Sequence, residues 1–339
     1  MYIANYWKKK MNWKNKKVFV TGAGGFIGSH LTEALVALKA DVRVLVQYNS
    51  KGSWGFIEQF DAATKDRIEV VAGDVRDFHF IKEAVRDRDV VFHLAALIAI
   101  PYSYSAPTSY VDTNIRGTLN VLQACREAQV GKMVHTSTSE TYGTAIYTPI
   151  DEQHPMQGQS PYSASKIGAD KMAESYYCSF GLPVATIRPF NTYGPRQSSR
   201  AIIPTIISQM LTQDEIHLGS LEPVRDFNYV KDTVDGFIKI AESERSVGEV
   251  INVGSGKGIS IGELVKIIEE LMAKKVTVIT EEKRKRPANS EVMTLICGNK
   301  KAQDVVGWEP RFSFKQGLSE TIEYIKDHLH EYKVNQYQK

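Results

Sequence analysis

The sequence has few cysteines, no long apolar run and little charge imbalance. Its three cysteines, Cys125, Cys178 and Cys297, show no paired metal-ligand spacing, and an odd number argues against a disulfide framework. We therefore expect no metal, and we expect each cysteine to be a small buried or half-buried hydrophobe. No apolar segment approaches membrane-spanning length, and no secretory signal is recognisable. The formal net charge is +3 over 339 residues, so no long-range field favours nucleic acid or a membrane as partner. Because no secretory signal or membrane segment is recognisable, the cytoplasm is the expected compartment.

Apolar, strand-like runs alternate with helical patterns along most of the chain. The strand-like runs are Lys17–Thr21, Asp41–Val46, Ile68–Ala72, Val90–Leu94, Lys132–Thr136, Val184–Arg188 and Glu249–Val253. The helical patterns include Gly28–Leu38, Phe78–Val85, Thr108–Ala128 and Pro161–Phe180. Such alternation indicates an α/β fold with a doubly wound parallel sheet, whose ligand crevice lies at the carboxyl ends of the strands.

A glycine-rich stretch, Thr21-Gly22-Ala23-Gly24-Gly25-Phe26-Ile27-Gly28, joins the first strand to the first helix. Gly22 suits the positive φ of a tight turn, Gly25 lets a ligand approach the backbone, and Gly28 permits close packing of helix on strand. The helix N-terminus then directs free N–H groups at an anion. The stretch predicts a Rossmann-type dinucleotide site, and the alternative is a tight turn that binds nothing.

The regular alternation weakens from Pro189 onward, which suggests a second lobe. We expect residues 13–188 and 227–258 to form the dinucleotide-binding domain, and residues 189–226 and 259–335 to form a smaller substrate-binding lobe. Residues 1–12 are expected to be a leader without fixed structure, because the first ten combine aromatic residues with three lysines and show no periodicity.

The end of the second strand bears on the form of the cofactor. An NAD site usually has an acidic residue there, which accepts a hydrogen bond from the ribose 2′-hydroxyl. Here no carboxylate occurs between Gln47 and Glu58. Hydroxyl, amide and ammonium groups stand there instead, on Tyr48, Asn49, Ser50 and Lys51, and Arg76 is a further cation downstream. Because such donors suit a 2′-phosphate, the sequence favours NADP over NAD.

A tyrosine and a lysine stand four residues apart in Tyr162-Ser163-Ala164-Ser165-Lys166, just after Pro161. Proline favours the first turn of a helix, and residues i and i+4 share a helical face. We expect the Lys166 ammonium to lower the pKa of the Tyr162 phenol, so that the phenol can accept a proton from a sugar hydroxyl as hydride leaves the carbon. The pair alone occurs by chance on many helices, and its weight comes from the glycine stretch upstream.

Several further motifs complete a resemblance to the extended short-chain dehydrogenases/reductases that act on nucleotide sugars. The motifs are Gly73-Asp74-Val75, His93-Leu94-Ala95-Ala96, Asn114-Ile115-Arg116-Gly117-Thr118, Ser137-Thr138-Ser139-Glu140-Thr141-Tyr142-Gly143, Arg188-Pro189-Phe190-Asn191-Thr192-Tyr193-Gly194-Pro195-Arg196 and Arg225-Asp226-Phe227-Asn228-Tyr229-Val230. With the glycine and Tyr-Lys motifs they span about residues 17–292. The match is specific for the family and less so for the reaction.

The resemblance implies a role for each matching residue. On the cofactor side it implies Gly22, Gly24, Gly25, Phe26, Ile27, Gly28, Asp74, Val75, Leu94, Ala95, Ala96 and Asn114, with Asp74 at the adenine. At the sugar, Thr138 would bond the 4-hydroxyl, Tyr162 would be the base, and Lys166 would hold the nicotinamide ribose. Asn191, Arg225 and Arg286 would bind the substrate diphosphate. For Arg225 the alternative is a structural ion pair with Asp226.

Glu140 discriminates between reactions of this family. A 4-epimerase removes and returns hydride at C4, whereas a 4,6-dehydratase must also take a proton from C5 and expel the C6 hydroxyl, for which a carboxylate is suited. Sugar dehydratases resemble this chain in having glutamate here, although the glucose type has aspartate in place of Ser139. Glu140 would then serve both proton transfers, or Ser139 would relay a proton through water. The alternative is that Glu140 only caps or pairs locally.

The sequence most resembles dehydratases of N-acetylhexosamines that feed nonulosonic acids such as legionaminic and pseudaminic acid. We therefore expect a 4,6-dehydratase acting on UDP-N-acetylglucosamine, with a GDP-linked sugar left open. A 4-epimerase and a UDP-glucuronate decarboxylase are the alternatives, and the decarboxylase would need a cation for the C6 carboxylate, for which Arg196 or Arg200 could reach. A non-catalytic nucleotide sensor is disfavoured because Thr138, Tyr162 and Lys166 are all present.

By analogy with the family, the helices near residues 108–128 and 161–180 are expected to form a four-helix homodimer interface. Their apolar faces could equally belong to the core.

Overall fold

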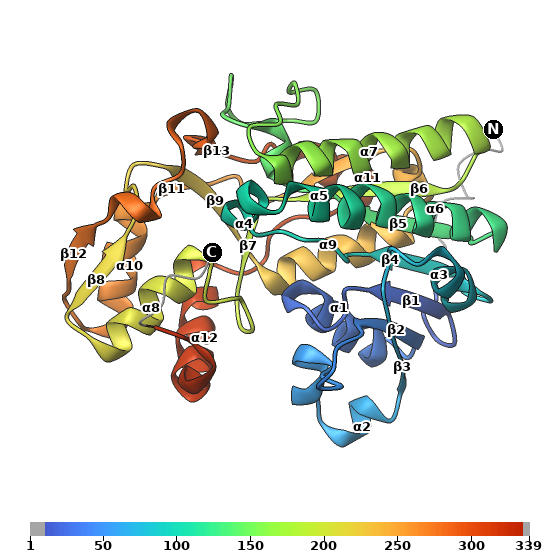
Figure 1. Cartoon of the computed structure of the whole chain (residues 1–339), viewed down its shortest axis with the longest axis horizontal. Helices are drawn as coiled ribbons and strands as arrows, with labels where there is room; N and C mark the ends of the chain where they lie inside the picture. The colour runs from blue at the N-terminus through green and yellow to red at the C-terminus, as the bar shows by residue number, and fades with distance from the viewer. Residues whose placement is uncertain (1–10, 335–339) are drawn as a thin grey trace, which may run out of the picture.

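The computed structural model describes residues 11–334, and a seven-stranded parallel sheet forms its centre (Figure 1). The strands follow the spatial order β10-β6-β5-β4-β1-β2-β3. They are β1 (Lys17–Thr21), β2 (Asp41–Gln47), β3 (Ile68–Gly73), β4 (Val90–His93), β5 (Lys132–Thr136), β6 (Val184–Pro189) and β10 (Val250–Val253). The strand order reverses at β1, so the ligand crevice of such a sheet falls beside the loops that follow β1 and β4. The predicted doubly wound sheet is confirmed.

Helices cover both faces of this sheet. One face carries α1 (Phe26–Ala37) and α9 (Val230–Glu242), and the other carries α3 (Phe78–Val85), α6 (Gly117–Glu127) and α7 (Pro161–Phe180). Side chains of β1 alternate between the faces, since Val18 and Val20 are buried in the core with α1 and α9, and Phe19 in the core with α3, α6 and α7. Burial on both faces explains why these strands are continuous apolar runs in the sequence.

The helix predicted over residues 108–128 is divided in the structure. It consists of α5 (Pro107–Tyr110), a π-helical turn (Val111–Arg116) and α6, and α4 (Ile100–Ser105) precedes it. The π turn contains Asn114, whose side chain is directed inward to bond the loop after β4. Such π turns commonly occur at functional sites. The bounds of α3 and α7 agree with the predicted ones, and Ser160 and Ser163 form a capping box at the start of α7.

A second group of elements packs beside the sheet. It contains α8 (Ile202–Thr212), α10 (Ile261–Met272), α12 (Phe314–Asp327), and the paired strands β8 (Glu215–Leu218) and β12 (Thr277–Thr280). Between this group and the large sheet lie β7 (Asn191–Tyr193), β9 (Val224–Tyr229), β11 (Gly258–Ser260) and β13 (Thr294–Leu295), which pair around β9. The helix α11 (Lys300–Val306) lies within the residues predicted for the smaller lobe, but it packs on α9 and β10 of the large sheet. The short α2 (Ala62–Lys65) precedes β3.

The predicted leader lies outside the described residues except for its last two. Just after it, Trp13 is buried and donates an indole hydrogen bond to Glu242 at 2.8 Å. Within residues 11–334 we find no helix long and apolar enough to cross a membrane. The same residues contain no cluster of three His, Cys, Asp or Glu side chains that could hold a metal. Cys125 and Cys297 are buried, whereas Cys178 is exposed, so the expectation of burial was wrong for that residue.

Candidate active site

The glycine-rich loop lies against the loop that follows β4. Gly22 has a φ of +71°, and a Cβ at this position would lie 2.8 Å from the Ala95 nitrogen. A Cβ at Gly28 would collide with the Gly22 carbonyl oxygen. Thr21 joins the two loops, because its hydroxyl oxygen accepts hydrogen bonds from the Leu94 and Ala95 N–H groups, at 3.1 Å each. Glycine is therefore required at both positions for backbone to approach backbone.

The N-terminus of α1 opens onto this loop. Gly25 is the N-cap residue and has no side chain to bond the N–H groups of the first turn, which include those of Phe26 and Ile27. Unbonded N–H groups at the positive end of a helix form a site for an anion such as a pyrophosphate. Together with the glycines, whose missing side chains leave the backbone accessible, these groups fit a dinucleotide.

Gly28→Ala is expected to destabilise the protein by about 1–3 kcal/mol, the usual cost of overpacking, and to release its dinucleotide. Thermal melting and the absorbance of bound nucleotide would measure both effects. Gly262→Ala is the matched control, since Gly262 lies in the first turn of α10 and the nearest atoms to a Cβ there belong to Leu221, 3.8 Å away. Dinucleotide retention by Gly28→Ala at the level of this control would contradict the assignment of the loop.

The residues predicted as cofactor donors lie at the end of β2. Tyr48 is 75 % exposed there. Asn49, predicted as a donor to the cofactor, uses its amide within its own loop: Nδ2 donates to the carbonyls of Gln47 and Ser53, and Oδ1 accepts from the N–H groups of Lys51 and Ser53. An asparagine in a turn commonly bonds nearby backbone in this way, and the contact of Asn49 with a cofactor stays a prediction.

The predicted adenine residue Asp74 is in an ion pair. Arg76 contacts its carboxylate through Nη2 at 2.5 Å, and hydrogen bonds from the Arg76 side chain lower the pKa of Asp74. Val75, next in the chain, is buried in the core with α3 and α6. Ala96 is half-buried in the loop after β4. Asn114 donates to the Leu97 carbonyl and to the Ser165 hydroxyl, both at 2.9 Å, and so joins that loop to α7.

Tyr162 and Lys166 lie in the first turns of α7, and both are buried, at 7 % and 4 % exposed. Tyr162 packs with Leu97, Ile100 and Tyr110 in a small apolar cluster. Thr138, which hydrogen-bonds Tyr162, precedes the turn that follows β5. The Thr138 hydroxyl oxygen accepts a hydrogen bond from the Glu140 N–H at 3.3 Å. The motifs predicted to meet at the sugar thus come together from β5 and α7.

The pKa of the Tyr162 phenol is raised in the structure, so the prediction of a lowered pKa was wrong for the side chains of this chain alone. Burial raises the pKa of Tyr162 well above its usual range, the Glu140 carboxylate raises it further, and a hydrogen bond with Thr138 opposes both. The Lys166 Nζ donates to the Thr136 carbonyl at 2.6 Å, and burial lowers the pKa of Lys166 itself to about 8. Desolvation of the phenol is the largest contribution to its raised pKa, and sequence spacing does not reveal burial.

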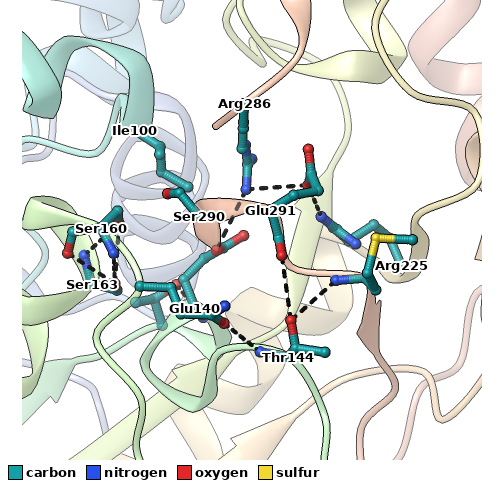
Figure 2. A network of polar contacts seen from close by, with 12 residues as sticks. Ile100, Glu140, Thr144, Ser160, Ser163, Arg225, Arg286, Ser290 and Glu291 are labelled. Carbon is teal, nitrogen blue, oxygen red and sulfur yellow. Dashed lines mark hydrogen bonds and ion pairs between the residues drawn. The ribbon is translucent and has the colours of Figure 1, made fainter. Parts of the chain in front are cut away.

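Four charged side chains alternate in sign beside this pair (Figure 2). Nη1 of Arg286 lies 3.7 Å from Glu140 and 3.8 Å from Glu291, and Nη2 of Arg225 lies 3.3 Å from Glu291. Arg225 thus pairs with Glu291. Its sequence neighbour Asp226 accepts instead from Ser255, Gly256 and Cys297. The alternative of an Arg225–Asp226 ion pair is therefore wrong.

Two buried polar atoms in and near this network make no hydrogen bond to the described residues, although one of them also belongs to the ion pairs above. Nη1 of Arg286 and Oδ1 of Asn191 are both buried without a hydrogen bond. Asn191 begins β7, which pairs with β9 beside Arg225. A buried polar group without a partner is costly, so both atoms fit a bound polar ligand. Ser139 is buried next to Glu140, at 3 % exposed.

Glu291 and Tyr110 were missed from the sequence. Glu291 stands five positions after Arg286 in a loop whose charges gave no periodic signal. Tyr110 packs its ring edge-on to Tyr162 with centroids 6.2 Å apart, and its hydroxyl bonds the Ala99 carbonyl. Its position depends on the π turn, which no sequence pattern indicated.

This fold and this arrangement of side chains define an extended short-chain dehydrogenase/reductase of the nucleotide-sugar dehydratase and epimerase type. The model of the GDP-mannose 4,6-dehydratase family matches residues 19–321, and the chain belongs to that family.

Relatives named for different reactions are similar to the chain. Human dTDP-D-glucose 4,6-dehydratase is 29 % identical over 328 residues, covering 94 % of this chain and 92 % of the relative. A putative UDP-glucose 4-epimerase of Methanocaldococcus jannaschii is 30 % identical, covering 91 % of this chain and 98 % of the relative. The structure of a Streptomyces venezuelae dTDP-glucose 4,6-dehydratase with NAD bound superposes with a TM-score of 0.84 at 29 % identity, covering 93 % and 98 % of the two chains. The family is therefore shown, and its members differ in reaction.

Proposed function

We propose that this protein is a nucleotide-sugar 4,6-dehydratase that acts on UDP-N-acetylglucosamine. The observation that supports elimination best is Glu140, a carboxylate only 9 % exposed whose charge acts on Tyr162. A buried carboxylate beside the base is more than C4 chemistry requires, whereas removal of the C5 proton requires such a group. Its contact with Arg286, rather than with its own loop, argues against a purely local capping role.

A bound nicotinamide dinucleotide would supply the acceptor and donor of hydride. Thr138 and Tyr162 hold the sugar 4-hydroxyl. Tyr162 accepts its proton as a phenolate, which the positive charge of a bound nicotinamide would favour. Glu140 then takes the C5 proton, made acidic by a ketone at C4, and the C6 hydroxyl leaves as water with a proton from Glu140 or through Ser139. Return of the hydride to C6 and of a proton to C5 would complete the loss of one water. Lys166 holds the ribose of the cofactor. Asn191, Arg225 and Arg286 bind the diphosphate, for which guanidinium groups are suited.

The apolar surroundings of Tyr162 support an uncharged sugar rather than a uronate. Leu97, Ile100 and Tyr110 pack against the phenol. Arg196, one of the two cations considered for a C6 carboxylate, pairs with Glu33 of α1 through two contacts at 2.6 and 3.1 Å. The charge of the other, Arg200, acts on Tyr110 beside the phenol, so a decarboxylase stays an alternative through that residue. A 4-epimerase is the second candidate, because Thr138, Tyr162 and Lys166 suffice for it and similar proteins bear that name.

For the cofactor we propose NADP, because β2 ends at Gln47 with no carboxylate and Lys51 stays exposed beside it. Similar structures contain bound NAD, so the cofactor retained by the purified protein is the decisive observation. We also propose a homodimer through helices near residues 108–128 and 161–180, where Val111, Tyr177 and Phe180 are 51, 39 and 49 % exposed. Three free cysteines support a reducing compartment such as the cytoplasm.

Mass spectrometry of the purified protein, incubated with UDP-N-acetylglucosamine and no added cofactor, tests the proposal. We expect a sugar nucleotide lighter by one water, and NADP among the small molecules released on denaturation. An isobaric product would identify a 4-epimerase, and NAD alone would refute the cofactor preference. Turnover of GDP-N-acetylglucosamine alone would identify a GDP-linked sugar as the substrate. Loss of carbon dioxide from UDP-glucuronate alone would identify a decarboxylase.

A further inference from the structure

One face of α7 carries a third ionisable side chain behind Tyr162 and Lys166. Asp170 follows Lys166 by four residues, so it lies one turn further along the same face. It is 5 % exposed, and the Asp170 carboxylate and the Lys166 ammonium bond two consecutive residues after β5 and at its end, Ser137 and Thr136. No step of the proposed reaction uses it.

Asp170 is held by side chains from two neighbouring strands. Its Oδ2 accepts from the Ser137 hydroxyl at 2.6 Å and from Arg188 Nη2 at 2.7 Å, and its Oδ1 contacts His135 Nε2 at 3.1 Å. Arg188 is 1 % exposed, and its guanidinium also bonds the Ser137 hydroxyl and lies over the Tyr142 ring at 4.6 Å. A buried charge pair fixed by this many bonds has one orientation.

Ionisable groups face Lys166 from each element packed around it. They are Tyr162 and Asp170 on α7, His93 on β4, His135 on β5 and Arg188 on β6, which reaches it through Asp170. Burial lowers the pKa of both histidines, so both are neutral near pH 7. Asp170 is then the negative charge among these groups that acts on the ammonium, and its charge raises the pKa of Lys166 against the effect of burial.

We propose that Asp170 is a positioning residue, which keeps the buried Lys166 ammonium charged and directed toward the cofactor ribose. The inference rests on the proposed roles of Tyr162 and Lys166. The ion pair of Asp170 with Arg188 sets how much negative charge Lys166 experiences, because the guanidinium compensates part of it. The two partners should therefore have opposite effects on Lys166.

Opposite shifts in a pH series test this arrangement. The fraction of dinucleotide retained by the holoenzyme during dialysis, and kcat, would be measured from pH 6 to 10. In Asp170→Asn we expect both to fall with rising pH about one unit earlier than in the wild type, as loss of a nearby opposite charge predicts. In Arg188→Gln we expect the fall about one unit later, because the carboxylate is less compensated. Glu174→Gln, on the exposed side of α7, is the control that should shift neither.

A purely structural role for Asp170 would lower retention equally at all pH values and move neither midpoint, which would overturn the proposal. If Asp170→Asn does not fold, Arg188→Gln remains, and an unshifted midpoint in that variant would overturn the proposal equally. Asp170→Glu, which keeps the negative charge, should stay near the wild-type midpoint. Dinucleotide retention does not depend on the sugar. Shifts in retention without turnover of UDP-N-acetylglucosamine would therefore sustain the inference and refute only the proposed reaction.

Discussion

Glu140→Gln should lower water elimination from the nucleotide sugar at least about 100-fold, the contribution expected from a general base, while the dinucleotide stays bound. The amide keeps the size of the side chain but cannot accept the C5 proton. Because the carboxylate contacts Arg286 at 3.7 Å and not the glycine loop, its loss leaves the cofactor cradle intact. Mass spectrometry of the product and absorbance of the retained nucleotide would measure the two effects separately.

Solvent exchange at C5 gives a sharper form of this test. In deuterated water the wild type should introduce deuterium at C5 of the sugar, and Glu140→Gln should not. Glu69→Gln is the control, since that exposed carboxylate on β3 pairs with Arg43 away from the site. Elimination by Glu140→Gln at the rate of the control would remove Glu140 from the reaction and favour an epimerase.

Much of the fold follows from local sequence patterns. Seven apolar runs predicted the seven strands to within one or two residues, because strands buried on both faces leave a continuous signal. The helix that begins after Ser160 was predicted at its correct bounds, since Pro161 and Gly181 mark its ends. The division of the helix near Asn114 was not predicted, because it depends on a side chain bonding a loop 17 residues earlier in the chain.

The candidate site shows the same limit. Motifs at strand ends converge because the carboxyl ends of a parallel sheet meet at one edge. Charge partners are less predictable: Arg225 pairs with Glu291, 66 residues away, rather than with its neighbour Asp226. The ionisation of a side chain is even harder to predict from the sequence. The pKa of Tyr162 depends on how completely Ile100 and Tyr110 exclude water, and sequence spacing carries no information on that.

Tyr162→Phe should lower kcat about 100-fold or more for both elimination and any epimerisation, because the phenol is the base that both require. The phenyl ring keeps the packing with Ile100 and Tyr110, so folding and dinucleotide retention should be unchanged. Tyr177→Phe, an exposed tyrosine near the end of the same helix, is the matched control. Activity in Tyr162→Phe within a few fold of this control would require another base.

The negative charge of Glu140 acts on the Tyr162 phenol, and this gives the pH dependence of oxidation at C4 a defined sign. A neighbouring carboxylate disfavours the phenolate and raises the pKa of Tyr162. Its neutral replacement in Glu140→Gln therefore lowers the pKa of Tyr162 relative to the wild type. Oxidation at C4, followed as nicotinamide absorbance in a single turnover, should then reach its half-maximal rate at a lower pH in Glu140→Gln than in the wild type, even though elimination is lost. The same or a higher midpoint would show that the carboxylate and the phenol do not share one site.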